Sequence, residues 1–502
     1  MKFFGLVISI LIWSGAFGQT LKMDDIHYRN FFSGTHFENN FAAHTSIKPM
    51  IYYSPSGSLK SYANHSNHNV SWWVNDNFEI YPIVDLGVGY DNIKGLAYDL
   101  GAGFASSIAK NKWCISAKIL PYYSQPNYIE DSIQSSQIDL GTGRPISFTK
   151  STFFRGELVG IYRLNKFFTF TGGYGKNFFG EGYRSLLLSD HAAANPYLKI
   201  ETTFHTIKYV NLFNVWNDFY QIDDSSKPIT KLSAMHYLSW NITKRFNLSL
   251  FETVIWQAKD SLNTRYFEPN YMNPFVFYRP VEYGLGSSDN VLVGLNISYK
   301  PSSKSTIYYQ LILDEFLISE LRSDQKWWGN KYGMQLGVKM TDLPVPNLYA
   351  QMELNFVRPF TYSHKESIQS YSHANASVAH PLGANFYELN TIISYKHNKQ
   401  RFTGQITYAG YGADTSSISY GQNVLASYAN RDDNYGHTIM QGEKHNVLSV
   451  SFICEYPVPN FKNMFLTAKY KWRSDWVNYK QHSNHFIEIG IRSRIWNAYD
   501  DI

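Results

Sequence analysis

The chain has 502 residues, 44% of them hydrophobic and 17% aromatic, and a formal net charge of +5 at pH 7. So small an excess, not gathered into basic runs, does not indicate a nucleic-acid partner. Beyond the first residues no apolar run approaches the roughly 20 residues of a membrane helix, so any membrane crossing would use strands. The 39 Tyr, 34 Phe and 12 Trp are typical of the aromatic girdles of a membrane barrel; an aromatic-rich secreted β-sandwich or propeller is the alternative.

Residues 1–18 have the features of a signal peptide. Lys2 gives a short positive region, Phe3–Trp13 is apolar but too short to span a bilayer, and Ala16–Gly18 supplies small residues before a cleavage site near Gln19. We therefore expect an exported protein. Residues 19–77 have a mixed pattern, which predicts a periplasmic or plug segment and a first strand region.

Alternation of apolar and polar residues dominates the rest, 78–502. In Val291–Lys300 every second residue is apolar, and after a turn at Pro301–Lys304 the same pattern continues to Asp314. This period of two predicts a hairpin with one apolar side. The same pattern recurs in 332–341, 348–356, 386–408, 447–472 and 487–495.

The strands are about ten residues long, and their polar faces carry Lys, Arg, Glu, Gln and Asn throughout. A long apolar stripe opposite a charged face is typical of strands between lipid and a polar lumen. We therefore predict an all-β fold: a single large antiparallel transmembrane β-barrel over 78–502.

The predicted connections are of two kinds. Short turns, such as Leu164–Lys166, alternate with long segments, which in barrels of this type face outside and carry function. We expect some of the long segments to fold into the lumen. They are Gly175–His205, Gln257–Asn290, Phe316–Lys331, Arg358–Asn385 and Gly410–His445.

Four ordered blocks in these segments carry a resemblance. They are Asn177–Asp190 with Asn195–Ile200, Asn273–Glu282 with Gly286–Asn290, Leu313–Phe316 before Trp327–Lys331, and Tyr371–His373 before Ala379–Asn385. Together they resemble the Wzi-like capsule assembly family of outer-membrane barrels, which includes a gliding-motility branch with RemB as its named example. The chain lacks the obvious N-terminal helical bundle of the enterobacterial members.

The resemblance implies an 18-stranded barrel in the outer membrane of a Gram-negative bacterium. It also implies a surface lectin that holds capsular or other exported polysaccharide. The alternatives are a structural component of a gliding-motility or secretion apparatus and a diffusion porin. The expected partners are surface polysaccharide, outer-membrane lipid and lipopolysaccharide, and motility or secretion proteins of the envelope.

The blocks contain flat aromatic faces for pyranose rings and charged groups for sugar hydroxyls or acidic sugars. The alternative for the aromatic residues is packing in a loop or interfacial belt. For the charged residues it is a salt-bridge network that fills the lumen. The candidate glycan-binding or lumen-network residues are Tyr183, Arg184, Asp190, Arg279, Glu282, Asp314, Glu315, Trp327, Trp328, Asn330, Glu353, Arg358 and His380.

Enzyme motifs are incomplete. Gly172–Asn177 resembles a phosphate loop but has Asn177 where the Ser or Thr would stand. His364, His373 and His380 are too widely spaced for a compact zinc motif. We predict no enzymatic activity, no catalytic residue, no metal and no cofactor.

Overall fold

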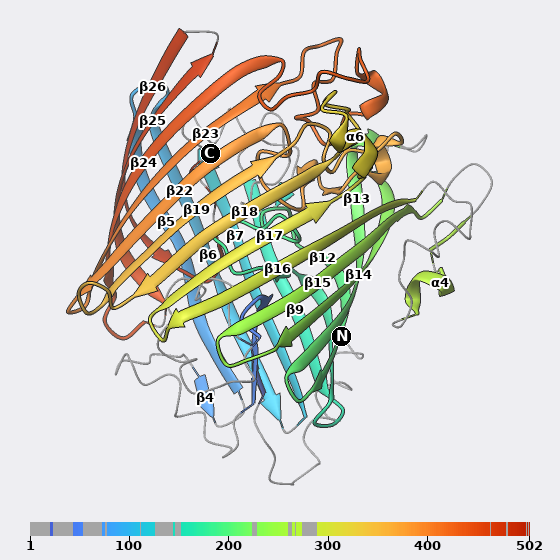
Figure 1. The fold of residues 1–502 in the computed structure, drawn as a ribbon. Coiled ribbons are helices and arrows are strands. Elements are labelled where there is room, and N and C mark those ends of the chain that lie inside the picture. The colour runs from blue at the N-terminus through green and yellow to red at the C-terminus, as the bar shows by residue number, and fades with distance from the viewer. Residues whose placement is uncertain are drawn as a thin grey trace.

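A computed structural model shows the fold (Figure 1). It describes residues 21–23, 44–53, 73–75, 78–110, 112–125, 144–145, 152–222, 228–259, 264–266, 268–273, 289–461, 463–477, 480–497, 499 and 501. The predicted signal peptide lies outside these residues.

Eighteen of the described strands form the wall of one closed antiparallel barrel. They are β5 (Phe78–Asp91), β6 (Gly95–Lys110), β7 (Trp113–Gln125), β9 (Thr152–Arg163), β10 (Phe168–Gly175), β12 (Asn195–Phe204), β13 (Ile207–Ile222), β14 (Pro228–Asn241), β15 (Phe246–Gln257), β16 (Asn290–Ser302), β17 (Ser305–Leu313), β18 (Tyr332–Thr341), β19 (Leu348–Val357), β22 (Phe386–His397), β23 (Gln400–Ala413), β24 (Glu443–Pro457), β25 (Met464–Val477) and β26 (Lys480–Ser493).

Each wall strand pairs with its neighbours in chain order, and β26 closes the ring on β5, where Ile487 pairs with Tyr90. Two short strands, β4 (Trp73–Asn75) and β8 (Arg144–Pro145), pair with β5 and β9. The predicted antiparallel barrel is confirmed, and so is the number of strands that the resemblance implies.

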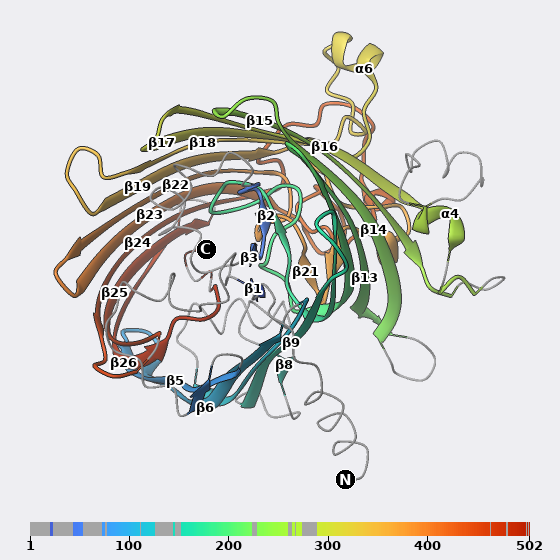
Figure 2. The same ribbon diagram turned by 90° about the horizontal axis from the view of Figure 1, so that it is seen from below.

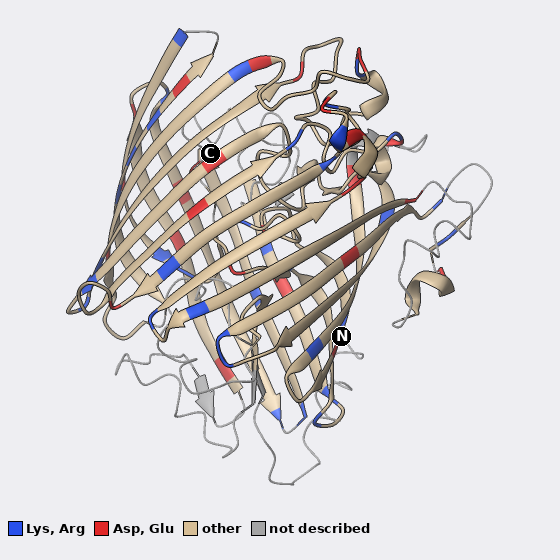
Figure 3. Cartoon of the chain, viewed as in Figure 1, with Lys and Arg blue, Asp and Glu red and all other residues tan. Residues whose placement is uncertain are grey.

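The wall is apolar outside and polar inside. On β19, Met352 and Leu354 are 47% and 48% exposed, whereas Glu353 between them is completely buried. On β26, Ile487 and Ile489 are the exposed pair, and Glu488 is buried. Because successive strand residues point to opposite faces, the apolar stripe lies outside, as it does in barrels that face lipid. Figure 3 shows charges of both signs within the wall.

The two ends of the barrel differ in their connections (Figure 1). One end has short turns, such as 205–206, 303–304 and 398–399. The other end has the long connections 314–331, 358–385 and 414–442. The predicted asymmetry is confirmed, so the end with the long connections is the expected extracellular end.

Segments of the chain fold into the lumen, as Figure 2 shows from below. In 176–194, β11 (Phe178–Phe179) pairs with β2 (Ile47–Lys48) from the N-terminal part. β3 (Ile51–Tyr53) pairs with β1 (Leu21–Met23).

A second inserted segment, 358–385, contains the small hairpin β20 (Ser372–His373) and β21 (Ala376–Ser377) and the short 3₁₀ helix η2 (Ser367–Gln369). After β26 the chain turns back inside and reaches Asp501, which is buried. The long segment 414–442 contains a further 3₁₀ helix, η3 (Tyr428–Asn430).

Several predicted boundaries are wrong. Residues Gly410–Ala413 and Glu443–His445, placed in a long segment, belong to β23 and β24, and Pro301–Ser302, placed in a turn, belong to β16. Residues Asn195–Phe204, placed in a long loop, form β12. In this strand Leu198 faces outward, while Lys199 and Glu201 turn into the lumen. The last strand ends at Ser493 rather than Ile495, which is buried in the returning tail.

Two short α-helices, α4 (Pro269–Met272) and α6 (Ile318–Arg322), lie in connections between wall strands. Among the described residues, no helix has the length and apolar character needed to cross a membrane.

Candidate functional site

The centre of the lumen holds a network of charged residues, the lumen network: Arg184, Glu353, Glu388 and Asp501. Arg184 Nη2 lies 3.1 Å from Glu388 Oε1 and 2.8 Å from Asp501 Oδ2, and both side chains of each pair are almost completely buried. Burial by itself would lower the pKa of Arg184, but Asp501 and Glu388 raise it well above its usual range. Arg184 is therefore a fixed cation that ties the inserted segment to the wall and to the tail.

Glu353 of β19 holds the backbone of the same segment. Its carboxylate accepts the N–H of Tyr183 at 2.9 Å and that of Arg184 at 3.1 Å. The approach requires Gly182, because a Cβ there would lie 2.2 Å from Glu353 Oε2. The glycine in the predicted block thus allows backbone to reach a wall carboxylate.

A second ion pair fixes the neighbouring residue of the segment. Lys339 of β18 lies 2.7 Å from Glu181, and Thr45 donates a hydrogen bond to the same carboxylate. Burial opposes ionisation of Glu181, but Lys339 and Lys48 together lower its pKa to about 2. The segment 176–194 is therefore anchored by charge at consecutive points.

The other inserted segment packs on the first. Tyr362 and Tyr371 donate hydrogen bonds to the carbonyl oxygens of Leu186 and Leu187, at 2.9 and 2.5 Å. His380 lies 2.8 Å from Glu388 and is stacked on Phe386. The two segments and the wall thus form one buried body.

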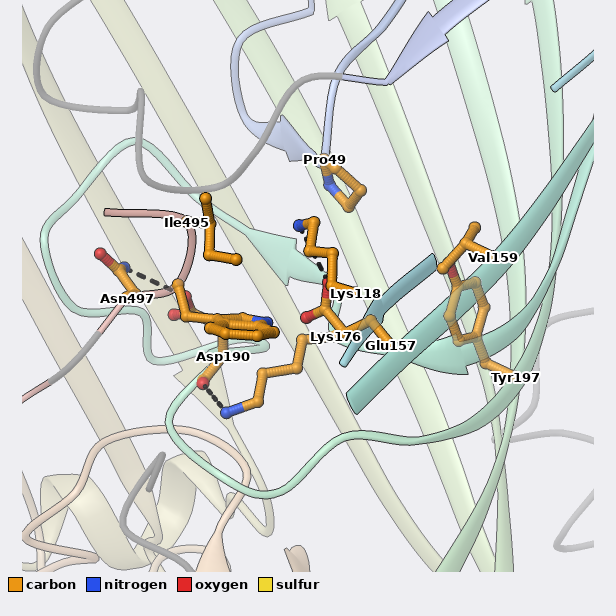
Figure 4. Close-up of a pocket in the computed structure, with 10 residues that line it drawn as sticks. Pro49, Lys118, Glu157, Val159, Lys176, Asp190, Tyr197, Ile495 and Asn497 are labelled. Atoms are coloured by element: carbon orange, nitrogen blue, oxygen red, sulfur yellow. Dashed lines mark hydrogen bonds and ion pairs between the residues drawn. The ribbon is translucent and has the colours of Figure 1, made fainter. Parts of the chain in front are cut away.

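Asp190 lies beside a recess in this body (Figure 4). The empty volume of the recess is about 450 Å³, and part of this volume is open to solvent. Asp190 accepts hydrogen bonds from Asn497 at 3.0 Å and from Tyr499 at 2.5 Å. Its role in the structure is thus to hold the returning tail. The recess is lined by Pro49, Lys118, Glu157, Val159, Lys176, Asp190, Tyr197, Ile495, Trp496 and Asn497.

At the end with long connections lies a second cluster, the rim cluster: Trp328, Lys331, Tyr428 and Arg431. The Arg431 guanidinium lies 3.8 Å from the centre of the Trp328 ring, and the Tyr428 ring lies 4.5 Å from the same ring. Trp328 is 9% exposed, while Tyr428 and Arg431 are half-buried. Contact with Trp328 therefore holds the Arg431 cation over the ring and the Tyr428 phenol beside it, each with part of its surface in solvent.

Lys331, whose Nζ lies 4.8 Å from the centre of the Tyr428 ring, joins two carboxylates. Its Nζ lies 3.2 Å from both Asp314 and Glu315. Asp314 also accepts the N–H of Tyr362 at 2.9 Å. Burial raises the pKa of Asp314 to about 6, which Lys331 partly counteracts. Both acids follow the end of β17, so they lie in the connection after the strand and both can reach Lys331.

The remaining predicted residues near the rim hold loops together. The side chain of Asn330 accepts the N–H of Leu317 at 2.8 Å and is buried. Arg358 donates to the carbonyl oxygens of His437, at 3.2 Å, and Trp327, at 3.4 Å. Trp327 itself is half-buried, so its ring is more accessible than that of Trp328.

The structure thus divides the predicted residues between two places. Tyr183, Arg184, Asp190, Glu353 and His380 lie in the lumen. The rim has Asp314, Glu315, Trp327, Trp328, Asn330 and Arg358. Arg279 and Glu282 lie outside the described residues.

Five residues that complete these clusters are not among the predicted site residues. Lys331 is the last residue of the block Trp327–Lys331, so the sequence points to its neighbourhood. Glu388 is a charged residue on the inward face of a predicted strand, and this signal could have revealed it. Tyr428 and Arg431 lie in a long connection without a distinctive pattern, and Asp501 follows the last strand. In the described part of the chain, no group of three or more His, Cys, Asp or Glu residues is arranged to hold a metal ion.

No protein-family model matches the sequence, and no curated protein matches it. Among solved structures, the chain is similar to Wzi, a carbohydrate-binding outer-membrane β-barrel involved in group 1 capsule assembly in Escherichia coli. The identity is 10%, the TM-score is 0.57, and the match covers 95% of this chain and 99% of Wzi.

Two other solved barrels are also similar. OprD from Pseudomonas aeruginosa is 10% identical, with a TM-score of 0.44, over 85% of this chain and 97% of OprD. OccAB2 from Acinetobacter baumannii is 9% identical, with a TM-score of 0.45, over 83% of this chain and 97% of OccAB2.

The similarity to Wzi shows the fold, which is that of a bacterial outer-membrane β-barrel. The predicted resemblance is confirmed at the level of this 18-stranded architecture.

Proposed function

We propose that this protein is a non-catalytic outer-membrane barrel that binds exported polysaccharide and retains it at the cell surface. The single observation that carries the proposal is the rim cluster. Trp328, Tyr428 and Arg431 combine aromatic faces with a fixed cation at the end of the barrel with long connections. Aromatic faces suit pyranose rings, and a fixed guanidinium suits the carboxylates of acidic sugars. The structural similarity to Wzi, a carbohydrate-binding barrel, supports the same function.

The inserted segments favour this function over a diffusion porin. Inward-facing residues of the wall that would line a water-filled pore, such as Lys199, Lys231 and Glu353, are fully buried. The chain itself therefore covers this part of the lumen. We expect no steady conductance when the pure protein is added to a planar bilayer. A stable open current would favour the porin.

Retention can be measured in the source bacterium. Deletion of the gene should move surface polysaccharide from the cells into the medium without reducing the total amount. Wild-type protein should restore the cell-bound fraction, whereas Tyr428→Ala combined with Arg431→Ala should not. The matched control is Asp433→Ala, which changes an exposed position on the same connection and should restore the cell-bound fraction. Full retention by the double variant at normal barrel levels would contradict the proposal.

A structural role in a motility or secretion apparatus would use the same loops. A pull-down from solubilised envelope separates the two roles. Recovery of glycan supports retention, and recovery of a stoichiometric protein complex without glycan supports the structural role.

A further inference from the structure

The connection 314–331 carries an exposed apolar surface outside the barrel. Phe316, Leu317, Ile318 and Leu321 are between 39% and 57% exposed. Ile318 and Leu321 are three residues apart in α6 and therefore share one face of the helix. Figure 2 shows α6 outside the ring of strands. These four residues form what we call the shoulder patch.

The shoulder patch continues the apolar surface of the wall. The Phe316 ring lies 6.2 Å from that of Tyr332, edge to face, and the Tyr332 ring lies 6.4 Å from that of Phe356 on β19. Phe356 belongs to the exposed apolar stripe of its strand, together with Leu354. An unbroken row of side chains thus leads from the lipid-facing wall to α6.

The wall strands next to the shoulder patch are short. β17, β18 and β19 have 9, 10 and 10 residues, whereas β24, β25 and β26 have 15, 14 and 14. A tilted strand needs about 9–11 residues to cross the hydrocarbon core. The residues directly after β17 therefore emerge at the membrane interface, while the longer strands extend well beyond it.

We propose that the shoulder patch is a lipid anchor: α6 lies in the interface of the outer leaflet, with Ile318 and Leu321 among the acyl chains. Ser319 points away from the face that Ile318 and Leu321 share, because successive helix residues are turned by about 100°. Arg322 follows Ile318 by four residues and is exposed, so its long side chain can reach the headgroups from the apolar side. An amphipathic turn in this position buries apolar area that water would otherwise cover. The anchor would fix the connection that carries Trp328 at a defined height above the membrane. The inference depends on the membrane location in the proposed function, but not on glycan binding.

Site-directed fluorescence in vesicles tests whether the shoulder patch lies among the acyl chains. Single cysteines at Ile318, Leu321 and Ser319 would be introduced into full-length protein in which Cys114→Ala and Cys454→Ala remove the native thiols. Each variant would be labelled with an environment-sensitive dye and refolded into phosphatidylcholine vesicles, with or without brominated acyl chains. Leu354→Cys on the wall serves as the lipid control and Asp433→Cys on an exposed loop as the water control.

We expect the dyes at Ile318 and Leu321 to emit at shorter wavelength than the dye at Asp433. We also expect brominated chains to quench them to an extent comparable with Leu354, at a depth of about 5–10 Å below the headgroup boundary. The dye at Ser319 should be quenched less.

Three other outcomes would overturn the inference. Emission at Ile318 and Leu321 that resembles Asp433 would place α6 in water. A shift to shorter wavelength without quenching, growing with protein density, would indicate contact with a second copy. If Leu354 itself escapes quenching, the membrane location fails, and the proposed function fails with it.

Discussion

The lumen network and the rim cluster use the same chemistry at different degrees of burial. In the lumen, the Arg184 guanidinium lies 4.8 Å from the centre of the Tyr183 ring and is fully buried. At the rim, Arg431 lies over Trp328 and remains half-buried. An arginine beside aromatic rings therefore does not by itself mark a ligand site. A cation without exposed surface holds the fold, and only a cation that keeps some exposed surface is available to a glycan.

The largest expected effect is at Arg184. Arg184→Ala leaves the carboxylates of Glu388 and Asp501 without their cation, and breaking a buried ion pair in this way costs about 3–5 kcal/mol. Urea unfolding of the protein in vesicles should show the loss, and a planar bilayer should show current as the inserted segment is released. Arg431→Ala is the matched control and should change neither. If Arg184→Ala had the stability of the wild type and gave no current in the bilayer, Arg184 would not hold the fold, and the distinction between the lumen network and the rim cluster would fail.

Asp314 lies where the two regions meet, because it contacts both Lys331 and the inserted residue Tyr362. Burial raises its pKa to about 6 in the folded protein, from the ordinary value of 3.8 for an aspartate side chain. The folded state therefore binds a proton at the Asp314 carboxylate more tightly than the unfolded state does. As the pH falls from 7 to 4, uptake of this proton raises the free energy of unfolding by up to about 3 kcal/mol. The gain is complete below pH 3.8 and is lost as the pH rises through 6.

The test is the pH dependence of the unfolding free energy. Asp314→Asn should flatten the slope between pH 4 and 7 relative to the wild type. Equal slopes in the two proteins would mean that Asp314 does not take up the proton.

Gly182 tests the backbone attachment of the lumen segment. A methyl group in Gly182→Ala would meet Glu353 Oε2 at 2.2 Å, and overpacking of this kind costs about 1–3 kcal/mol. Gly404→Ala on β23 is the matched control, since its Cβ would meet nothing within 4 Å. In thermal unfolding, Gly182→Ala should unfold at a lower temperature than the wild type, whereas Gly404→Ala should unfold at the wild-type temperature. If both unfold like the wild type, the segment does not need this close approach.

The wall could be predicted from the sequence because its signal is local. The alternation in 332–341 matches β18 residue for residue, since every outward position must be apolar and the opposite face contains the polar residues. The strand β12 is not predicted, because its residues lie within the segment Gly175–His205 that the sequence analysis assigns to a long connection.

The clusters could not be predicted in the same way. Arg184 meets Glu388 across 204 positions and Asp501 across 317 positions of the chain. Only closure of the barrel and insertion of the segments bring these residues together. The sequence therefore identified residue types suited to a site but could not tell which of them would be buried.

The smallest effect is expected at the rim, where the change should affect binding and not stability. A contact with an aromatic ring contributes about 1 kcal/mol, so Tyr428→Ala should weaken binding roughly fivefold to tenfold. Its free energy of unfolding should stay within about 0.5 kcal/mol of the wild type, because Tyr428 is a half-buried loop residue.

The most direct test of the account is a titration of the purified barrel with polysaccharide extracted from the surface of the same strain. The wild type should bind, and Tyr428→Ala and Arg431→Ala should bind more weakly at unchanged stability. Asp433→Ala should bind like the wild type. Undiminished binding by both variants, or no binding by the wild-type protein, would contradict the claim that the rim cluster holds glycan.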